Sequence, residues 1–144
     1  MKVENLFYFT KHPRKILRKS ILCCYIQDNI ECENDLFNSL NEQLKFSVFG
    51  WNWDALHDSL CGFEGIKQRN IVIIHEKLNI NEYIFHKYIL HVMRASLLWK
   101  KYSYEHRLFP IFFIADRDKI IEILYSKNIQ NWFKIECEHF NLTY

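Results

Sequence analysis

Two aspartates stand four positions apart in an aromatic stretch of the chain. Asp54 and Asp58 lie within the run Phe-Gly-Trp-Asn-Trp-Asp-Ala-Leu-His-Asp-Ser-Leu-Cys-Gly-Phe at positions 49–63. On a helix, both carboxylates would project from one side and repel each other by roughly a few tenths of a kcal/mol. Because a fold gains nothing from this repulsion, we expect the pair to serve a cationic partner surface, a metal ion or a proton-transfer reaction.

The pair is expected on a short helix whose ends can be read from the sequence. Asn52 is suited to cap a helix over 53–61, and Gly62 is suited to end it. The apolar side chains then share the face that packs on the core, which leaves both carboxylates at its exposed margin. The side chains expected on the inward face are Trp53, Leu56 and Leu60, with His57 beside them, and Cys61 joins the aspartates on the neighbouring stripe.

Strand-like and helix-like patterns alternate through the middle of the chain. The apolar runs at 21–26, 71–74 and 108–115 are typical of buried strands. Apolar residues at helical spacing predict helices over 33–46, with Asn34 as the N-cap, and over 81–103. This order predicts an α/β fold with a mainly parallel sheet.

Both ends of the chain extend beyond this core. Segment 3–10 has the composition of an edge strand, and 116–131 has a helical pattern. Over 133–140, apolar and charged residues alternate, which predicts a half-buried strand. We therefore expect one domain over 1–144, with a core at 21–115, an N-terminal extension at 1–20 and a C-terminal helix-strand extension at 116–144.

Several residues around the aspartate pair match a known family in order and without gaps. They are Gly50, Asn52, Trp53, Asp54, Ala55, Leu56, Asp58, Leu60 and Gly62, followed by the strand-like run at 71–74. In these residues the chain resembles the barstar family of ribonuclease inhibitors. For 21–115, the resemblance implies a small three-layer-type fold with a mainly parallel sheet of three core strands packed by helices, which extra strands at both termini would extend.

The resemblance also implies a partner and a contact surface. In the family, the helix and the loop before it plug a ribonuclease active site, where two carboxylates imitate two phosphates. By position, the expected contacts are Gly50, Trp51, Asn52, Asp54, His57 and Asp58, with Val48 and Phe63 at the rim and Glu105 as a further acidic contact. The expected partner is thus the protein domain of a cognate ribonuclease toxin.

The chain departs from the family pattern at three points. His57 stands where the family commonly has tryptophan, Val48 stands where some members have an aromatic contact residue, and the net charge is +2 rather than strongly acidic. These differences favour a specialised immunity protein that is paired with one toxin in a toxin–antitoxin or bacterial competition system. The sequence leaves open whether His57 contacts the partner or supports the fold.

Composition restricts the class of protein. At 144 residues with 49% hydrophobic and 25% charged side chains, the chain is long enough to bury a core without metal or disulfide staples. The five cysteines form no CxxC pair and leave one over, which is typical of a reducing compartment. No signal peptide or membrane-spanning run is recognisable, so we expect a cytoplasmic protein that contacts no membrane.

Other chemistries remain open at the same residues. Asp54, His57, Asp58 and Cys61 have the i, i+3, i+4 and i+7 spacing of ligands on one helix face, which Cys137 or His139 would have to complete for a metal site. Cys61 with His57 could form a nucleophile and its base, and the two aspartates an acid–base dyad. No motif supports an enzyme, so we expect no catalysis, metal, cofactor or small-molecule substrate.

The N-terminal segment offers a second class of function. Basic side chains cluster there near three aromatic residues, a combination that can attract phosphate and stack bases. The cluster comprises Lys11, His12, Arg14, Lys15, Arg18 and Lys19, and the aromatic residues are Phe7, Tyr8 and Phe9. A nucleic-acid-binding module is therefore the alternative hypothesis to the inhibitor.

Overall fold

The structure is a computed structural model that describes residues 1–13, 19–26, 30–46, 50–75 and 79–144. Its strands are β1 (Tyr8–Thr10), β2 (Ile21–Ile26), β3 (Asn70–His75) and β4 (Arg107–Phe113). Its α-helices are α1 (Glu33–Leu44), α2 (Trp53–Gly62), α3 (Glu82–Lys101), α4 (Arg117–Leu124) and α5 (Lys127–His139). The short 3-10 helices η1 (Val3–Leu6) and η2 (Ile114–Asp116) complete the elements. In the described part of the chain, no helix is both long and apolar enough to cross a membrane.

The four strands form one parallel sheet in the order β1-β4-β3-β2. The predicted α/β class and the three parallel core strands are confirmed. The predicted N-terminal edge strand is confirmed only for Tyr8–Thr10, which pairs with Ile111 to Phe113, because Val3–Leu6 forms η1 instead. The sheet edge beside the first half of β4 is thus not covered by β1.

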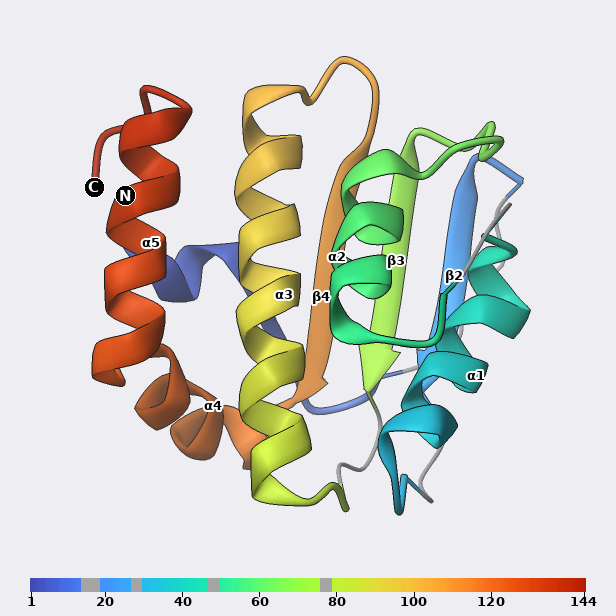
Figure 1. Cartoon of the computed structure of the whole chain (residues 1–144), viewed down its shortest axis with the longest axis horizontal. Helices are drawn as coiled ribbons and strands as arrows, with labels where there is room; N and C mark the ends of the chain where they lie inside the picture. Colours follow the sequence, from blue (N-terminus) through green and yellow to red (C-terminus); the bar gives the residue numbers. More distant parts are fainter. Residues whose placement is uncertain (14–18, 27–29, 47–49, 76–78) are drawn as a thin grey trace.

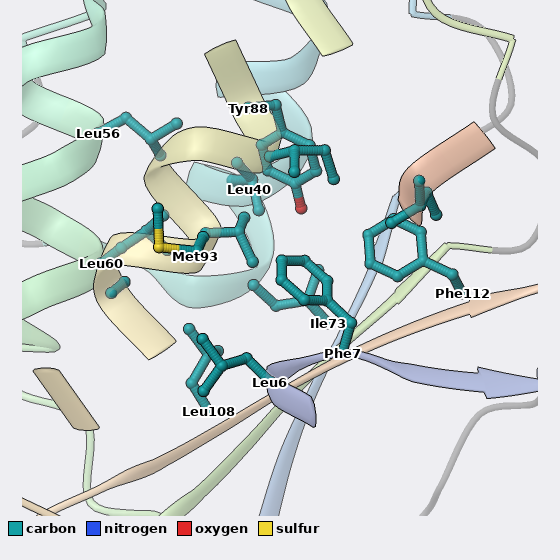
Figure 2. Close-up of a cluster of buried hydrophobic side chains, with 14 of the residues drawn as sticks. Leu6, Phe7, Leu40, Leu56, Leu60, Ile73, Tyr88, Met93, Leu108 and Phe112 are labelled. Atoms are coloured by element: carbon teal, nitrogen blue, oxygen red, sulfur yellow. The ribbon is translucent and has the colours of Figure 1, made fainter. Parts of the chain in front are cut away.

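Helices α1, α2 and α3 lie against one face of the sheet (Figure 1). The predicted fold class, a mainly parallel sheet packed by helices, is thus confirmed. Leu56 and Leu60 of α2 meet Met93 of α3 and the sheet residues Ile73 and Phe112 in one apolar cluster (Figure 2). This packing determines which face of α2 points away from the core.

The predicted strand over 133–140 is wrong, because these residues belong to helix α5. The apolar residues there fit both the two-residue period of a strand and the period of a helix. Phe133 and Cys137 are four positions apart, which places them on one face of either element. Ile129, Phe133 and Cys137 are buried in α5, whereas Ile135, which the strand pattern placed with them, is 53% exposed. The helix predicted over 116–131 is in turn divided between α4 and α5.

Two helix ends differ from the prediction by one or two residues. Helix α1 begins after Cys32 rather than Asn34, because the Asp35 carboxylate accepts hydrogen bonds from the backbone N–H groups of Glu31 (3.0 Å) and Cys32 (3.4 Å). Helix α2 includes Gly62, and it is Phe63 that adopts the left-handed conformation, with φ of 45°.

A fully buried histidine joins the sheet to α3. The His75 ring stacks on Phe112 at 4.0 Å between centroids and lies 2.9 Å from the carbonyl oxygen of Ile111 and 2.6 Å from the hydroxyl of Tyr88. The carbonyl can only accept, so Nδ1 carries the proton and Nε2 accepts from Tyr88. Burial lowers the pKa of His75 to about 3, and the folded protein therefore holds this ring neutral.

This histidine makes the fold sensitive to acid. A group whose pKa is lower in the folded state stabilises the fold only above its unfolded pKa of about 6.5, and the contribution is lost as pH falls toward the folded pKa of about 3. From pH 7 to pH 4.5, His75 should account for a loss of about 2–3 kcal/mol in the free energy of unfolding. Urea denaturation at both pH values measures the total loss, and a His75 variant isolates the part that this residue contributes.

The His75→Phe variant should be less stable at pH 7, because Tyr88 and Ile111 lose a partner, but its stability should change less between the two pH values. The matched control is His86→Gln, which alters an exposed histidine of α3 and should keep the wild-type pH dependence. An unchanged pH dependence in His75→Phe would contradict the assignment.

Candidate functional site

The junction between the loop and α2 is closed by Asn52. Its side-chain oxygen accepts a hydrogen bond from the Ala55 backbone N–H at 2.8 Å, and its amide group donates to the Gly50 carbonyl at 3.2 Å. The predicted N-cap is thus confirmed, and the same side chain also holds the preceding loop. Together, these two bonds fix the direction in which α2 leaves the loop.

The loop approaches the first turn of α2 closely. A Cβ atom at Gly50 would lie 3.3 Å from the Cβ of Ala55, a distance that most real contacts exceed. Trp51 follows in the left-handed conformation, with φ of 56°, and its side chain is 44% exposed. The backbone therefore presents an indole to solvent immediately before the helix.

Asp54 and Asp58 are both exposed on α2. Neither carboxylate takes part in a hydrogen bond or ion pair within the part of the chain that the structure describes. The fold thus holds two like charges one turn apart, and among the described residues compensates them only through the first-turn position of Asp54 on α2 and the positive charge of Lys87 near that carboxylate. A cationic group from outside this chain would stabilise both carboxylates further.

Trp53 anchors the first turn of α2 to two other helices. Its ring meets Phe37 of α1 edge-on at 5.1 Å and stacks on His91 of α3 at 5.6 Å with 13° between the planes. Lys87 lies over the same ring, with Nζ 5.9 Å from its centroid. The indole is half-buried in this contact, so the predicted inward orientation of Trp53 is confirmed.

His57 lies half-buried between the carboxylate pair and α3. Its ring centroid is 5.5 Å from that of His91, and its nitrogens are 3.7 and 3.9 Å from the Cys61 sulfur. Burial, followed by the positive charge of Arg94, lowers the pKa of His57, while the two aspartates oppose the shift. Burial and the neighbouring His57 and Arg94 lower the pKa of His91 to about 4. Both rings are therefore neutral at pH 7.

The sequence did not predict the polar residues that lie near His57 on its inner side, chiefly Arg94. Arg94 of α3 forms an ion pair with Glu136 of α5 at 2.7 Å, and its guanidinium carbon lies 4.2 Å from the Trp132 ring centroid. His91 and Arg94 are three residues apart on a largely apolar helix, which was the only available signal. Their proximity to His57 depends on the packing of α2, α3 and α5.

Phe63 was predicted at the rim of a contact surface, but it is only 1% exposed. Its ring stacks on Trp99 at 5.6 Å and meets His106 at 5.6 Å. The indole N–H of Trp99 donates to the Leu60 carbonyl at 2.8 Å, which fixes the last turn of α2. Phe63 is therefore a core residue that supports the helix.

Glu105 is exposed in the turn before β4. The turn is held at the C-terminal end of α2 because the neighbouring His106 packs on Phe63 and approaches the Gln68 carbonyl at 3.0 Å. Asp54 lies in the first turn of the same helix. The three predicted acidic contacts are thus distributed from one end of α2 to the other.

A groove of about 290 Å³ runs beside α2. Asp58 and Glu64 supply its carboxylates, and small or apolar residues form most of the remaining wall. The residues that line it are Phe46, Gly50, Ala55, Asp58, Ser59, Gly62, Phe63 and Glu64. This surface is acidic and concave next to the aspartate pair.

The geometry does not favour a metal site or a nucleophile at these residues. Among the described residues, no group of three or more His, Cys, Asp and Glu side chains is placed to hold a metal ion. Cys137 is buried in the core, whereas His139 is exposed. Burial raises the pKa of Cys61 to about 12, so its sulfur remains a thiol rather than a nucleophilic thiolate.

The structure describes only part of the basic N-terminal cluster. Lys11, His12 and Lys19 are exposed, whereas Arg14, Lys15 and Arg18, like the predicted rim residue Val48, lie outside the described residues. Of the three aromatic residues that were expected to stack bases, Phe7 is only 4% exposed and belongs to the core, Phe9 is half-buried, and Tyr8 is 43% exposed.

Comparison with known proteins identifies the family. The model of the family described as "Barstar (barnase inhibitor)" matches residues 23–95, just over half of the chain and including all of α1, α2 and β3. Neither the curated proteins nor the solved structures contain a match. Members of this family are inhibitors rather than enzymes, and the family implies a ribonuclease as the protein partner. The chain therefore belongs to the barstar family of barnase inhibitors.

Proposed function

We propose that this protein is an immunity protein that binds a cognate ribonuclease toxin and occludes its active site. The observation that carries the proposal is the exposed pair Asp54 and Asp58, neither of which forms a hydrogen bond or ion pair within the described part of the chain although α2 itself is firmly anchored. Two carboxylates held one turn apart can occupy the positions at which a ribonuclease holds two phosphates of RNA. A bound inhibitor of this kind would keep RNA out of the active site by steric exclusion and by occupying the phosphate-binding groups.

The proposed contact surface follows α2 from end to end. Asp54, Asp58 and Glu105 supply negative charge, while Trp51 and His57 contribute ring surface around it. Gly50 and Asn52 act by shaping the loop, as their contacts with Ala55 indicate. Complementary charge should also accelerate association, so the association rate constant should fall as salt is added.

We further propose that the protein acts in the cytoplasm of the cell that makes the toxin. All five cysteines are free, and Cys24 and Cys137 are buried as thiols, which is compatible with a reducing compartment.

The first experiment is a pull-down from the native host, with mass spectrometry and a ribonuclease assay on the material that co-purifies. A stoichiometric ribonuclease that is silent in the complex and active after separation is the expected result. Recovery of nucleic acid alone would contradict the proposal.

Removing either carboxylate should weaken binding without weakening the fold. We expect Asp54→Ala and Asp58→Ala each to raise the Kd for the co-purified ribonuclease by about 30-fold or more, which corresponds to the ~2 kcal/mol of an interface hot spot, a scale that barstar itself helped to define. The melting temperature should stay within about 1–2 °C of the wild type, because neither side chain bonds to the fold.

The control for this pair is Glu122→Ala, which removes an exposed carboxylate from α4 and should leave the Kd unchanged. If Glu122→Ala weakened binding as much as the aspartate variants, overall charge rather than the α2 pair would determine affinity. If the aspartate variants lost stability in proportion to affinity, they would be structural residues.

Asn52 should act on affinity through the conformation of the loop. Asn52→Ala removes the acceptor of the Ala55 N–H and should lower the free energy of unfolding by about 1 kcal/mol, with weaker ribonuclease binding. Asn52→Ser retains a capping oxygen but loses the amide that donates to the Gly50 carbonyl, so it should restore stability while affinity stays low. Denaturation and binding measured on the same preparations test this, and full recovery of affinity in the serine variant would show that the bond from the asparagine amide to Gly50 does not control binding.

A further inference from the structure

A second cavity lies between η1, the C-terminal half of α3 and the first half of β4. Its volume is about 320 Å³, which is at the lower end of the range for small-molecule sites. The residues that line it are Asn5, Leu6, Tyr8, Ser96, Trp99, Lys100, Ser103, Arg107, Leu108 and Phe109. It shares no described lining residue with the groove beside α2, so it is a separate site.

The described lining of this cavity is cationic. Lys100 and Arg107 carry its charges, and none of the described lining residues carries a carboxylate. Within the described chain, neither side chain forms an ion pair. Arg69 brings a third cation and second guanidinium close to the lining, because its Nε donates to the Ser103 carbonyl at 2.9 Å. Such a group of donors favours phosphate or carboxylate.

A buried hydroxyl in the lining lacks a partner. Ser96 is 5% exposed, and its oxygen forms no hydrogen bond within the part of the chain that the structure describes. Buried polar groups are normally paired, because an unpaired one loses its interactions with water without replacement. Ser96 and Lys100 stand at i and i+4 on one face of α3, and Ser103 lies in the turn that follows the helix. All three line the cavity, so the hydroxyls and the ammonium group can act on the same ligand.

The lining also contains aromatic side chains. The rings of Tyr8 and Phe109 lie 5.6 Å apart at 56°, and Tyr8 is 43% exposed. Trp99 directs its indole N–H to the Leu60 carbonyl and so presents only ring surface to the cavity. Strand β1 pairs with β4 only from Ile111 onward. On this side of β4, Leu108 and Phe109 therefore have no strand partner among the described residues, although they pair with β3 on the other side.

We propose that this cavity binds a small anion that carries a planar ring, the chemistry of a nucleoside monophosphate. Lys100 and Arg107 hold the anionic group, the Ser96 hydroxyl donates to it, and Tyr8 and Phe109 contact the ring. The proposal does not depend on the inhibitor function, because it uses none of the proposed contact residues of α2.

The ligand for the test is adenosine 5′-monophosphate, which is titrated into ¹⁵N-labelled protein and followed by NMR. We expect saturable shifts of amide signals around Ser96, Lys100 and Phe109, with a Kd about tenfold or more lower than for adenosine or inorganic phosphate in separate titrations. Equal affinity for phosphate and the nucleotide would overturn the proposal, since the ring would then contribute nothing. Absence of saturation at millimolar concentration, or shifts elsewhere in the protein, would also overturn it.

Charge variants provide the matched comparison. Lys100→Gln and Arg107→Gln should each weaken nucleotide binding by about tenfold, and Ser96→Ala should weaken it less. Lys101→Gln removes the same charge from the same exposed turn of α3 but lies outside the cavity lining, so it should bind as the wild type does. If Lys101→Gln and Lys100→Gln weakened binding equally, the attraction would be a general surface-charge effect and no site would exist. The amide spectrum of each variant shows whether its fold is retained.

Discussion

Helix α2 is attached to α3 at both of its ends. At the first turn, the Trp53 ring stacks on His91, and at the last turn the Trp99 indole donates to the Leu60 carbonyl while Phe63 stacks on the same indole. Aromatic contacts of this kind add to the apolar area that Leu56 and Leu60 already bury. With both ends fixed, the helix has a defined rotation about its axis, and that rotation directs Asp54 and Asp58 toward solvent.

The firm attachment of α2 matters because the two carboxylates repel each other and so destabilise the helix that carries them. Like charges one turn apart oppose helix formation weakly, and here no described side chain bonds to them. The Asn52 cap and the contacts with α3 offset this repulsion before a partner is present. A partner that supplies cations then meets acceptors already in position and loses little conformational entropy on binding.

Histidines serve the fold as neutral aromatic rings. His75 and His91 are buried, and burial lowers the pKa of both, so that each contributes a planar ring at neutral pH without the cost of a buried charge. His57 extends this arrangement toward the surface, beside the aspartates but in contact with His91. The same position therefore borders both the core and the proposed partner surface, which is why the sequence left its role open.

Local chemistry within the sequence was enough to predict the α/β order, the Asn52 cap and the exposed side of α2, because each depends on residues within a few positions of one another. It was not enough at 133–140, where Phe133 and Cys137 satisfy both periods and only their burial against the rest of the fold selects the helix. Tertiary packing alone buried Phe63 and brought His91 and Arg94 close to His57. It also placed Glu105 at the C-terminal end of α2 and enclosed the cavity around Ser96. These contacts join residues that are distant in the chain, and their geometry follows from the way whole helices and the sheet pack together rather than from any local pattern.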